Sequence, residues 1–495
     1  MVKKINRRNF MKGSLAAAAG IGLASSLTAK VRANVNGANN DIRVAIVGIR
    51  NKGEQHIDVF REIKGVRVVA LCDVDKDILA ERAKKFAERN EEISTYTDVR
   101  RVLDDKDIDA VVIATPNHWH SLITIWACQA GKDVYVEKPI SHNIREGRKV
   151  VEAAGKYNRI VQAGTQNRSD EGLIPAMEYI HGGNLGKILY VQGLCYKRRK
   201  SIGKVDGPQP IPESVDYDLW TGPAPLGPLM RKNLHYDWHW VWPTGNGDIG
   251  NQGVHEMDVC LWALGKTELA PRVISFGGRF GYDDDGETPN TMFSFLDYKP
   301  VPIIFEVRGL PKDKNAGWAM DHYLGVRVGN IIRCENGYFA GGRGGGWIYD
   351  NDGNKIKRFP GDGGGTHQAN FIEAVRSRKA SDLRAPVLGG HLSAALCHMA
   401  NISYRLGQKS TPERVREAVN EIPLEYAQKR WESVQEHLFL NWVDTAKTRV
   451  TVGPWLEMEP ENERFIGEGE YGLARWANEM LTRDYRKPFV VPDKV

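Results

Sequence analysis

Two glycines and one acidic residue near the start of the chain have the spacing of a nucleotide site. Gly48 and Gly53 bound a short turn between the apolar, β-branched run 42–47 and a helical pattern, and a second apolar run ends at Asp73, 25 positions after Gly48. Backbone N–H groups at a helix start bind phosphates, and a carboxylate after the second strand accepts ribose hydroxyls. The pattern predicts a dinucleotide site that favours NAD over NADP, because a carboxylate repels the additional phosphate of NADP.

Arg50 stands where the usual glycine pattern of such turns has its middle glycine. A glycine in that position lets the backbone approach the pyrophosphate closely, which a long side chain prevents. A guanidinium can instead contact phosphate oxygens directly, so we expect Arg50 to lie on the phosphates. By itself this turn is a weak signal, and the prediction depends on the elements that follow it.

The elements that must position this turn alternate along the first third of the chain. Apolar strands and amphipathic helices succeed one another, which is typical of a Rossmann doubly wound parallel sheet, an α/β fold that binds ligands at the carboxyl ends of its strands. We expect further strands at 110–114, 134–136 and 160–163, and helices at 121–130 and 144–157. Later apolar runs predict an α+β domain with a large open, mainly antiparallel sheet, with strands around 188–195, 273–276, 292–296, 303–307 and 326–334.

Two segments at the carboxyl ends of predicted strands are more specific. Residues 114–120 read Ala-Thr-Pro-Asn-His-Trp-His, and residues 137–139 read Glu-Lys-Pro. Together they resemble the glucose-fructose oxidoreductase, inositol dehydrogenase and MocA (Gfo/Idh/MocA) family, and the resemblance covers residues 41–407. It implies that Lys138 lies beside the nicotinamide and positions or polarises the reacting hydroxyl. It also implies cofactor contacts for Glu137, at the ribose, and on the nicotinamide side for Thr115, Pro116 and Asn117.

By the same resemblance, residues 247–258 carry the acid–base group. Members of the family have an aspartate four residues before a histidine on one helical face, and these positions hold Asn251 and His255. An amide can orient a hydroxyl or an imidazole but cannot take a proton, so acid–base chemistry falls to His255, together with Lys138. Gln166 and Arg168 follow the sixth strand, where relatives contact cofactor and substrate.

Three of the 13 tryptophans fall between positions 238 and 242, directly before that helix. Trp238 and Trp240 alternate in a segment that reads as extended, and such rings can pack on the faces of a sugar. A packed loop or a subunit contact explains the same pattern equally well. His235 and His239 have i,i+4 spacing without further ligands, so no metal site is predicted.

The N-terminus differs from the rest of the chain in charge. The 495 residues carry a formal charge of +6, yet seven of the 68 basic residues and none of the 62 acidic ones lie in 1–33. The remainder is close to neutral, which removes the electrostatic basis for nucleic-acid binding. Residues 6–12, Asn-Arg-Arg-Asn-Phe-Met-Lys, resemble the bacterial twin-arginine signal, which implies export in the folded state to the periplasm. A lipid anchor would need a cysteine near the cleavage site, and the sequence has none there. We therefore expect no stable membrane anchor.

These observations divide the chain into five parts: a signal peptide (1–33), a linker (34–40), a Rossmann domain (41–165), a substrate domain (166–407) and a C-terminal extension (408–495). We expect an exported, NAD-dependent oxidoreductase that acts on a ring hydroxyl of a sugar, glycoside or cyclitol, with a tightly bound cofactor and a homo-oligomeric assembly. One alternative is a redox-neutral NAD-dependent glycosidase or lyase that acts through a transient keto-sugar. Another is a cofactor-bound sugar-binding protein with little catalysis.

Overall fold

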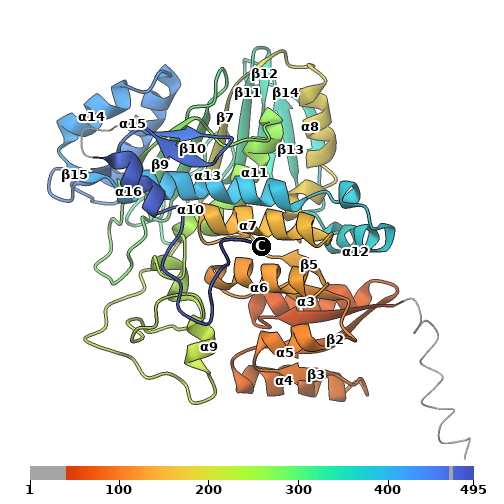
Figure 1. Ribbon diagram of the computed structural model, residues 1–495. Helices are drawn as coiled ribbons and strands as arrows, with labels where there is room; N and C mark the ends of the chain where they lie inside the picture. The colour runs from red at the N-terminus through yellow and green to blue at the C-terminus, as the bar shows by residue number, and fades with distance from the viewer. Residues whose placement is uncertain (1–40, 468–471) are drawn as a thin grey trace, which may run out of the picture.

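The computed structural model describes residues 41–467 and 472–495 (Figure 1). The predicted signal peptide and linker, residues 1–40, lie outside this part. No helix in the described ranges combines the length and the apolar character needed to cross a membrane. All six cysteines are free and buried.

The first domain is a six-stranded parallel sheet in the order β3-β2-β1-β4-β5-β6. Its strands are apolar and buried on both faces, because helices cover each side. The predicted Rossmann fold is confirmed. The elements are β1 Ile42–Val47, α3 Asn51–Glu62, β2 Val66–Cys72, α4 Lys76–Ala87, β3 Ser94–Tyr96, α5 Val99–Asp104, β4 Ala110–Ile113, α6 Asn117–Gln129, β5 Asp133–Val136, α7 Ile144–Lys156 and β6 Val161–Ala163.

The second sheet has twelve strands, and its main path runs β14-β13-β12-β11-β7-β10-β9-β8-β16-β15. Only β7 and β10 pair in parallel, so the expected large, mainly antiparallel sheet is confirmed. Its first nine strands are β7 Ile188–Tyr196, β8 Arg272–Gly278, β9 Thr291–Leu296, β10 Ile303–Arg308, β11 Val328–Cys334, β12 Gly337–Gly342, β13 Gly345–Tyr349 and β14 Lys355–Pro360, with β15 Gln408–Ser410 at the far edge.

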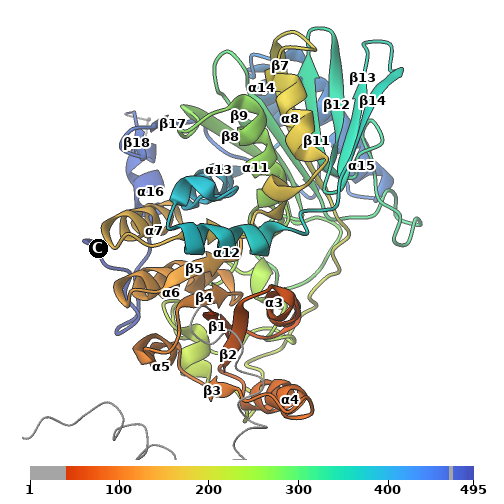
Figure 2. The ribbon, with the colours of Figure 1, turned by 90° about the vertical axis from the view of Figure 1, so that its right-hand side faces the viewer.

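Helices fill the space between the two sheets (Figures 1 and 2). The apolar faces of α8 (Leu173–His181), α11 (Gly253–Leu264) and α13 (Val387–Arg405) pack on the second sheet. Helix α13 also lies against α7, and α12 (His367–Ser377) packs on the first domain through Phe371. The two domains therefore share a continuous apolar contact, which fixes the carboxyl ends of the Rossmann strands against α10 (Gly247–Asn251) and α11.

The C-terminal extension covers the opposite face of the second sheet. Trp431 and Val434 of α15 (Glu425–Leu440) pack on phenylalanines of β8 and β9, and α14 (Pro412–Asn420) extends this core. Strands β16 (Val450–Val452) and β17 (Leu456–Glu459) pair with β8, and β18 (Arg464–Ile466) pairs with β17. The part of this sheet face that β8 and β9 form is therefore covered by the chain itself.

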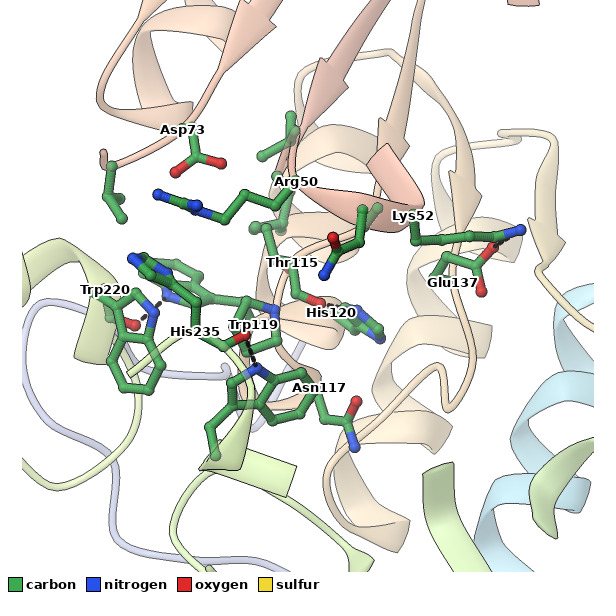
Figure 3. A pocket seen from close by; sticks show the side chains of 18 of the residues that line it. Arg50, Lys52, Asp73, Thr115, Asn117, Trp119, His120, Glu137, Trp220 and His235 are labelled. Atoms are coloured by element: carbon green, nitrogen blue, oxygen red, sulfur yellow. Dashed lines mark hydrogen bonds and ion pairs between the residues drawn. The ribbon is translucent and has the colours of Figure 1, made fainter. Parts of the chain in front are cut away.

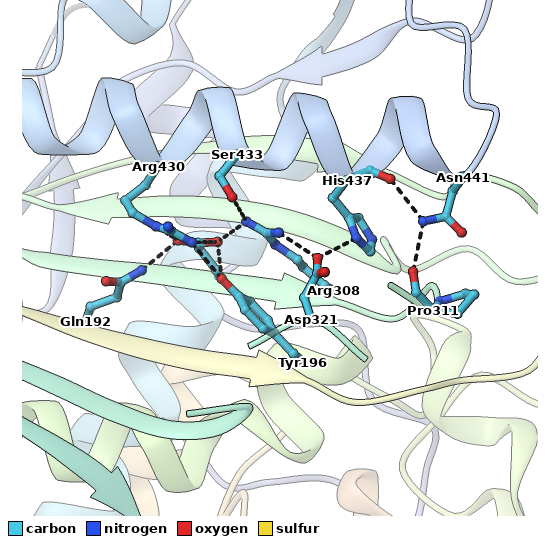
Figure 4. A network of polar contacts seen from close by, with 10 residues as sticks. Gln192, Tyr196, Arg308, Pro311, Asp321, Arg430, Ser433, His437 and Asn441 are labelled. Carbon is cyan, nitrogen blue, oxygen red and sulfur yellow. Dashed lines mark hydrogen bonds and ion pairs between the residues drawn. The ribbon is translucent and has the colours of Figure 1, made fainter. Parts of the chain in front are cut away.

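A buried polar network joins α15 to the sheet (Figure 4). Glu306 accepts hydrogen bonds from Arg430 at 2.8 Å, from Arg308 at 2.8 Å and from Tyr196 at 2.5 Å. Burial alone raises the pKa of Glu306, but the two guanidinium charges outweigh it and lower the pKa. The carboxylate thus stays ionised, and the network fixes the register of α15 on the sheet.

The chain then returns to the first domain. After α16 (Leu473–Glu479), the backbone N–H of Arg145 donates to the carbonyl of Leu481, and Phe489 enters the Rossmann core against Trp119. Asp493 pairs with Arg145 at 2.7 Å. We call residues 481–495 the C-terminal strap, since they connect the extension to the Rossmann domain.

Candidate active site

A cavity of about 410 Å³ opens at the carboxyl ends of β1, β2, β4 and β5 (Figure 3). The Rossmann domain forms one side, and α9 (Tyr217–Thr221), the 3-10 turn η2 (Asp237–Trp240), α10 and α11 form the other. Twelve predicted site residues line it: Gly48, Arg50, Asp73, Thr115, Pro116, Asn117, Glu137, Lys138, Gln166, Trp238, Asn251 and His255.

The glycine turn after β1 has the shape that a phosphate requires. Gly48 has φ +78°, and a Cβ there would lie 2.8 Å from the backbone of Ala114. A Cβ on Gly53 would lie 1.8 Å from the Gly48 carbonyl oxygen, so the helix can only begin this close to the strand with glycine at both positions. Gly53 itself does not line the cavity and acts through this packing. In the first turn of α3, the N–H groups of Gly53 and Glu54 bond the Arg50 carbonyl, whereas those of Asn51 and Lys52, which line the cavity, have no backbone partner in the described chain.

Arg50 does not lie across that helix start. Its guanidinium pairs with Asp75 and extends toward Asp73, as Figure 3 shows. Arg50 thus lines the cavity while paired with Asp75, and its contact with the cofactor phosphates stays a prediction. Its Nε and the hydroxyl of Thr115 are buried without a hydrogen-bond partner among the described residues. Unpaired polar atoms at a cavity wall fit a polar ligand such as a dinucleotide.

Asp73 is held rigidly at the end of β2. One carboxylate oxygen accepts the N–H of Ile49 at 3.0 Å and the other accepts the N–H of Asp75 at 3.1 Å. Burial raises the pKa of Asp73, against the effect of these donors and of Arg50. Each oxygen retains a free lone pair, so the side chain can still accept ribose hydroxyls.

Glu137 is the most strongly bound carboxylate of the site. It accepts hydrogen bonds from His56 at 3.0 Å and Gln166 at 2.9 Å, and Lys52 lies 3.7 Å away. Burial alone raises its pKa, but His56 and the charge of Lys52 outweigh burial and lower the pKa well below the usual range. Glu137 is therefore an ionised anchor and not a proton donor.

Lys138 reaches across the cavity to α10. Its Nζ donates to the carbonyl oxygen of Asn251 at 2.8 Å and lies 3.4 Å from that residue's Oδ1. No carboxylate of the described chain lies within ion-pair distance of this Nζ. Burial lowers the pKa of Lys138, and nearby cations add to the effect while Glu137 opposes it. One N–H of the ammonium remains free to contact a ligand.

His255 lies beside this ammonium at the start of α11. Burial and the charge of Lys138 lower its pKa well below the usual value, so the imidazole is neutral. Its Nδ1 is buried and finds no partner in the described chain. Residues 247–264 form two helices, α10 and α11, which meet at Gln252. Asn251 and His255 nevertheless line the same cavity.

The predicted substrate residues are only partly brought together. Trp238 lines the cavity, but residues 237–240 form a 3-10 turn and not the expected extended segment. Trp240 is buried under the guanidinium of Arg199, 5.2 Å from its ring centre, and lies outside the cavity lining. Arg168 is also outside, because Asp258 binds it at 2.7 Å and its guanidinium stacks on Trp262.

Aromatic residues cover the cavity beside Asp73. Trp119 donates from Nε1 to the carbonyl oxygens of Leu219 and Trp220, at 3.0 and 3.1 Å. A Cβ on Gly222 would lie 2.2 Å from the Trp119 ring, so α9 is packed tightly on α6. We call the surface formed by the rings of Trp119 and Trp220, together with the adjoining Leu219, the aromatic cover. Sequence reasoning did not find it, because residues 217–222 become part of the site only through the tertiary fold.

Lys52 and Arg343 also line the cavity and were missed, as was His56, which lies outside the cavity lining and contacts Glu137. His56 lies on the apolar face of α3, where a single polar residue is usually a satisfied core group. Arg343 stands alone between glycines, and that isolation was the available signal. Among the described residues, no three His, Cys, Asp or Glu side chains are placed to hold a metal ion.

A Rossmann domain whose cavity is closed by an α+β domain, with a lysine and a neutral histidine inside, is an arrangement found in nicotinamide-dependent oxidoreductases. Residues 42–165 match the oxidoreductase family profile for the NAD-binding Rossmann fold, and residues 186–291 match its C-terminal alpha/beta domain. The chain belongs to the Gfo/Idh/MocA family. Residues 4–24 match the twin-arginine translocation signal sequence, which indicates export.

Individual relatives are more distant. An inositol 2-dehydrogenase of Salmonella typhimurium is 31% identical over 36% of this chain and 52% of its own length. A glycosyl hydrolase family 109 protein of Shewanella baltica is 29% identical over 31% of this chain and 38% of its own length. The chain thus spans about half or less of the length of these curated relatives. The WlbA dehydrogenase of Bordetella pertussis, solved with NADH and UDP-GlcNAcA, has the same fold, with a TM-score of 0.55 at 19% identity over 74% of this chain and 97% of that one.

Proposed function

We propose that the protein oxidises a ring hydroxyl of a sugar, glycoside or cyclitol with a resident nicotinamide cofactor. The observation that carries the proposal is the placement of Lys138, Asn251 and His255 in one cavity with the glycine turn and Asp73. When bound, the cofactor supplies the acceptor for the hydride that leaves the carbinol carbon. The inositol 2-dehydrogenase relative supports a cyclitol or sugar as substrate.

Residues of the chain bind the substrate hydroxyl, move its proton and hold the cofactor. The free N–H of Lys138 binds the reacting oxygen, and its lowered pKa favours passing the hydroxyl proton onward. His255 is neutral and can take that proton, while the Asn251 amide orients the hydroxyl. Gly48, Gly53 and the start of α3 hold the phosphates, and Asp73 and Glu137 bind hydroxyls. Asp73 favours NAD over NADP through charge repulsion.

The aromatic cover and the export signal support a cofactor that stays bound. Trp119 and Trp220 close the cavity beside Asp73, so exchange requires α9 to move away from α6. Free nicotinamide cofactors are expected to be scarce outside the cytoplasm. A cofactor loaded before export must then be regenerated in place, by a second substrate or by the product of the first.

The first test is to purify the exported protein without added cofactor, denature it and quantify the released nucleotide. Stoichiometric NAD or NADH supports the proposal, and an empty protein that binds NAD weakly contradicts it. Lys138→Met should then abolish the reduction of bound cofactor by a panel of sugars and cyclitols. Lys132→Met is the matched control, because Lys132 is also a buried lysine bound to backbone carbonyls but lies outside the cavity.

A redox-neutral glycosidase is the second candidate, favoured by the family 109 relative. Transient oxidation acidifies the neighbouring C–H group, and loss of that proton eliminates the glycosidic group as the aglycone alcohol. Water then adds to the unsaturated keto-sugar, and the hydride returns to its carbonyl carbon. Release of an aglycone from a chromogenic glycoside without net formation of reduced cofactor would identify this reaction. Net reduction without aglycone release would identify the dehydrogenase.

A further inference from the structure

Two glycine-rich loops of the second sheet are fastened beside the active site by one buried carboxylate. Asp170 is fully buried, and its Oδ2 accepts the backbone N–H groups of Gly344 at 2.8 Å and Gly363 at 2.7 Å. Its Oδ1 accepts the N–H groups of Gly172 and Leu173, each at 2.9 Å. Four charge-assisted hydrogen bonds thus tie the β12–β13 hairpin and the loop before α12 to the crossover that follows β6.

The glycines of these loops are required by close contacts. A Cβ on Gly361 would lie 2.0 Å from Asp170, and one on Gly364 would lie 2.1 Å from the carbonyl oxygen of Gln166. A Cβ on Gly345 would lie 1.9 Å from the carbonyl oxygen of Phe359. The loops therefore approach the floor of the cavity as closely as bare backbone allows. Arg343 is the only residue with a side chain in the run 341–346.

Arg343 carries a charge that the protein does not neutralise. Its Nε donates to the carbonyl oxygen of Gly363 at 3.1 Å, which leaves both terminal nitrogens available at the rim of the cavity. No carboxylate in the described ranges lies within ion-pair distance of it. Two other arginines on this side, Arg168 and Arg199, are bound by Asp258 and Asp248. Arg343 therefore differs from Arg168 and Arg199 in that its two terminal nitrogens bind no carboxylate of the described chain.

The charges around His255 have an excess of cations. Lys138, Lys52 and Arg343 line this part of the cavity, and Glu137 is the carboxylate among them. The charges of Lys138, Arg343 and Lys52 all act to lower the pKa of His255, and Glu137 opposes them. A neutral sugar gains nothing from this field, whereas an anionic one is attracted by it.

We infer that the substrate is an anionic sugar derivative, and that Arg343 binds its acidic group while Lys138 and His255 act on a hydroxyl. The two terminal nitrogens of a guanidinium fit the two oxygens of a carboxylate, and a phosphate presents the same chemistry. This inference rests on the proposed function, since it uses the same cavity. The inference specifies in addition that the substrate is negatively charged, a property that the roles proposed for the catalytic residues do not require.

The test measures binding to the NADH-loaded protein by the change in cofactor fluorescence, with matched pairs of hexoses and hexuronates and with hexose phosphates. We expect the best acid to bind about tenfold to hundredfold more tightly than its neutral partner, with a preference that falls as salt is added. Arg343→Gln should reduce this preference to about threefold or less. Arg358→Gln, an exposed arginine on β14 that stacks on Trp347 and does not line the cavity, should retain it.

Each outcome separates the inference from the proposed function. Equal binding of acids and neutral sugars overturns the inference, even if neutral sugars reduce the cofactor. An Arg343→Gln variant that weakens NADH and leaves the preference for acids intact also overturns it, because Arg343 would then serve the cofactor. Acids that bind through Arg343 but never reduce the cofactor support the inference and contradict the proposed oxidation. A stronger preference for phosphates than for carboxylates supports it and identifies the anionic group as a phosphate.

Discussion

Release of the cofactor should be controlled by Arg486, which is not part of the cavity. Arg486 lies on the C-terminal strap and holds α9, the element that carries Leu219 and Trp220 of the aromatic cover. Its guanidinium donates to the Asp218 carboxylate at 2.6 Å, to the Asp218 carbonyl at 2.7 Å and to the Gly222 carbonyl at 3.1 Å. Arg486→Ala removes all three contacts and leaves the cover attached to α6 by Trp119.

The size of the effect follows from exposure. The side chain of Arg486 is 21% exposed and that of Asp218 is 58% exposed, so their ion pair contributes less than about 1 kcal/mol. Of the two bonds to carbonyl oxygens, the one to Gly222 is partly buried and the one to Asp218 is exposed, so each adds about 0.5 kcal/mol, at the lower end of the usual range. Opening of α9 should become easier by about 1.5 kcal/mol, which corresponds to a release rate about tenfold faster.

The assay is stopped-flow fluorescence of NADH-loaded protein chased with excess NAD. Arg145→Ala is the matched control, because it removes the ion pair of the strap to Asp493 without touching α9. We expect release to accelerate only for Arg486→Ala, with similar free energies of unfolding for both variants. An unchanged release rate in Arg486→Ala, or equal acceleration in Arg145→Ala, would refute the reasoning that the strap holds the cover through Arg486.

Three other predictions use single substitutions. Lys138→Met should lower the rate of cofactor reduction by about a hundredfold to ten-thousandfold in single-turnover measurements, with the dissociation constant for NADH changed far less. Asp73→Ala should narrow the preference for NAD over NADP in binding titrations, and an unchanged ratio would show that another group excludes the phosphate. Burial alone raises the pKa of Glu463, but hydrogen bonds from His391 and Arg148 outweigh it and lower the pKa to about 2. The ionised Glu463 carboxylate stabilises the fold fully above about pH 4.5, and this stabilisation disappears as the pH falls toward about 2. Glu463→Gln should therefore lower the free energy of unfolding by about 3 kcal/mol at neutral pH and by almost nothing at about pH 2, as measured by chemical denaturation.

The Rossmann domain was predictable because its signals are local. A buried parallel strand is an uninterrupted apolar run, and the runs at 42–47, 66–72 and 110–114 each fall within a residue of the observed strand. Lys138 and His255 were found through short motifs whose spacing reflects the strand end and the helix start that carry them. Their meeting in one cavity was expected from the fold, and the structure places them there.

Other features depend on contacts between distant residues and leave little trace in the sequence. Strands β12 to β14 were not predicted, because β12 and β13 are rich in glycine and β14 exposes lysine and arginine at the edge of the sheet. Trp240 and Arg168 have the residue types of a sugar site, but Arg199 and Asp258 hold them elsewhere. Which aromatic or cation faces a cavity depends on such partners, and one sequence does not specify them.

The C-terminal strap also determines when the cofactor cavity can finish folding. Arg483 donates to the carbonyl of His118, 365 positions earlier, and Phe489 fills the Rossmann core beside Trp119. Neither contact can form until residues 483 and 489 have left the ribosome, so the wall of the cofactor cavity is finished only after they are made. The twin-arginine signal at 4–24 is made first. We expect the protein to acquire its cofactor in the cytoplasm, in the interval between the synthesis of these residues and transport.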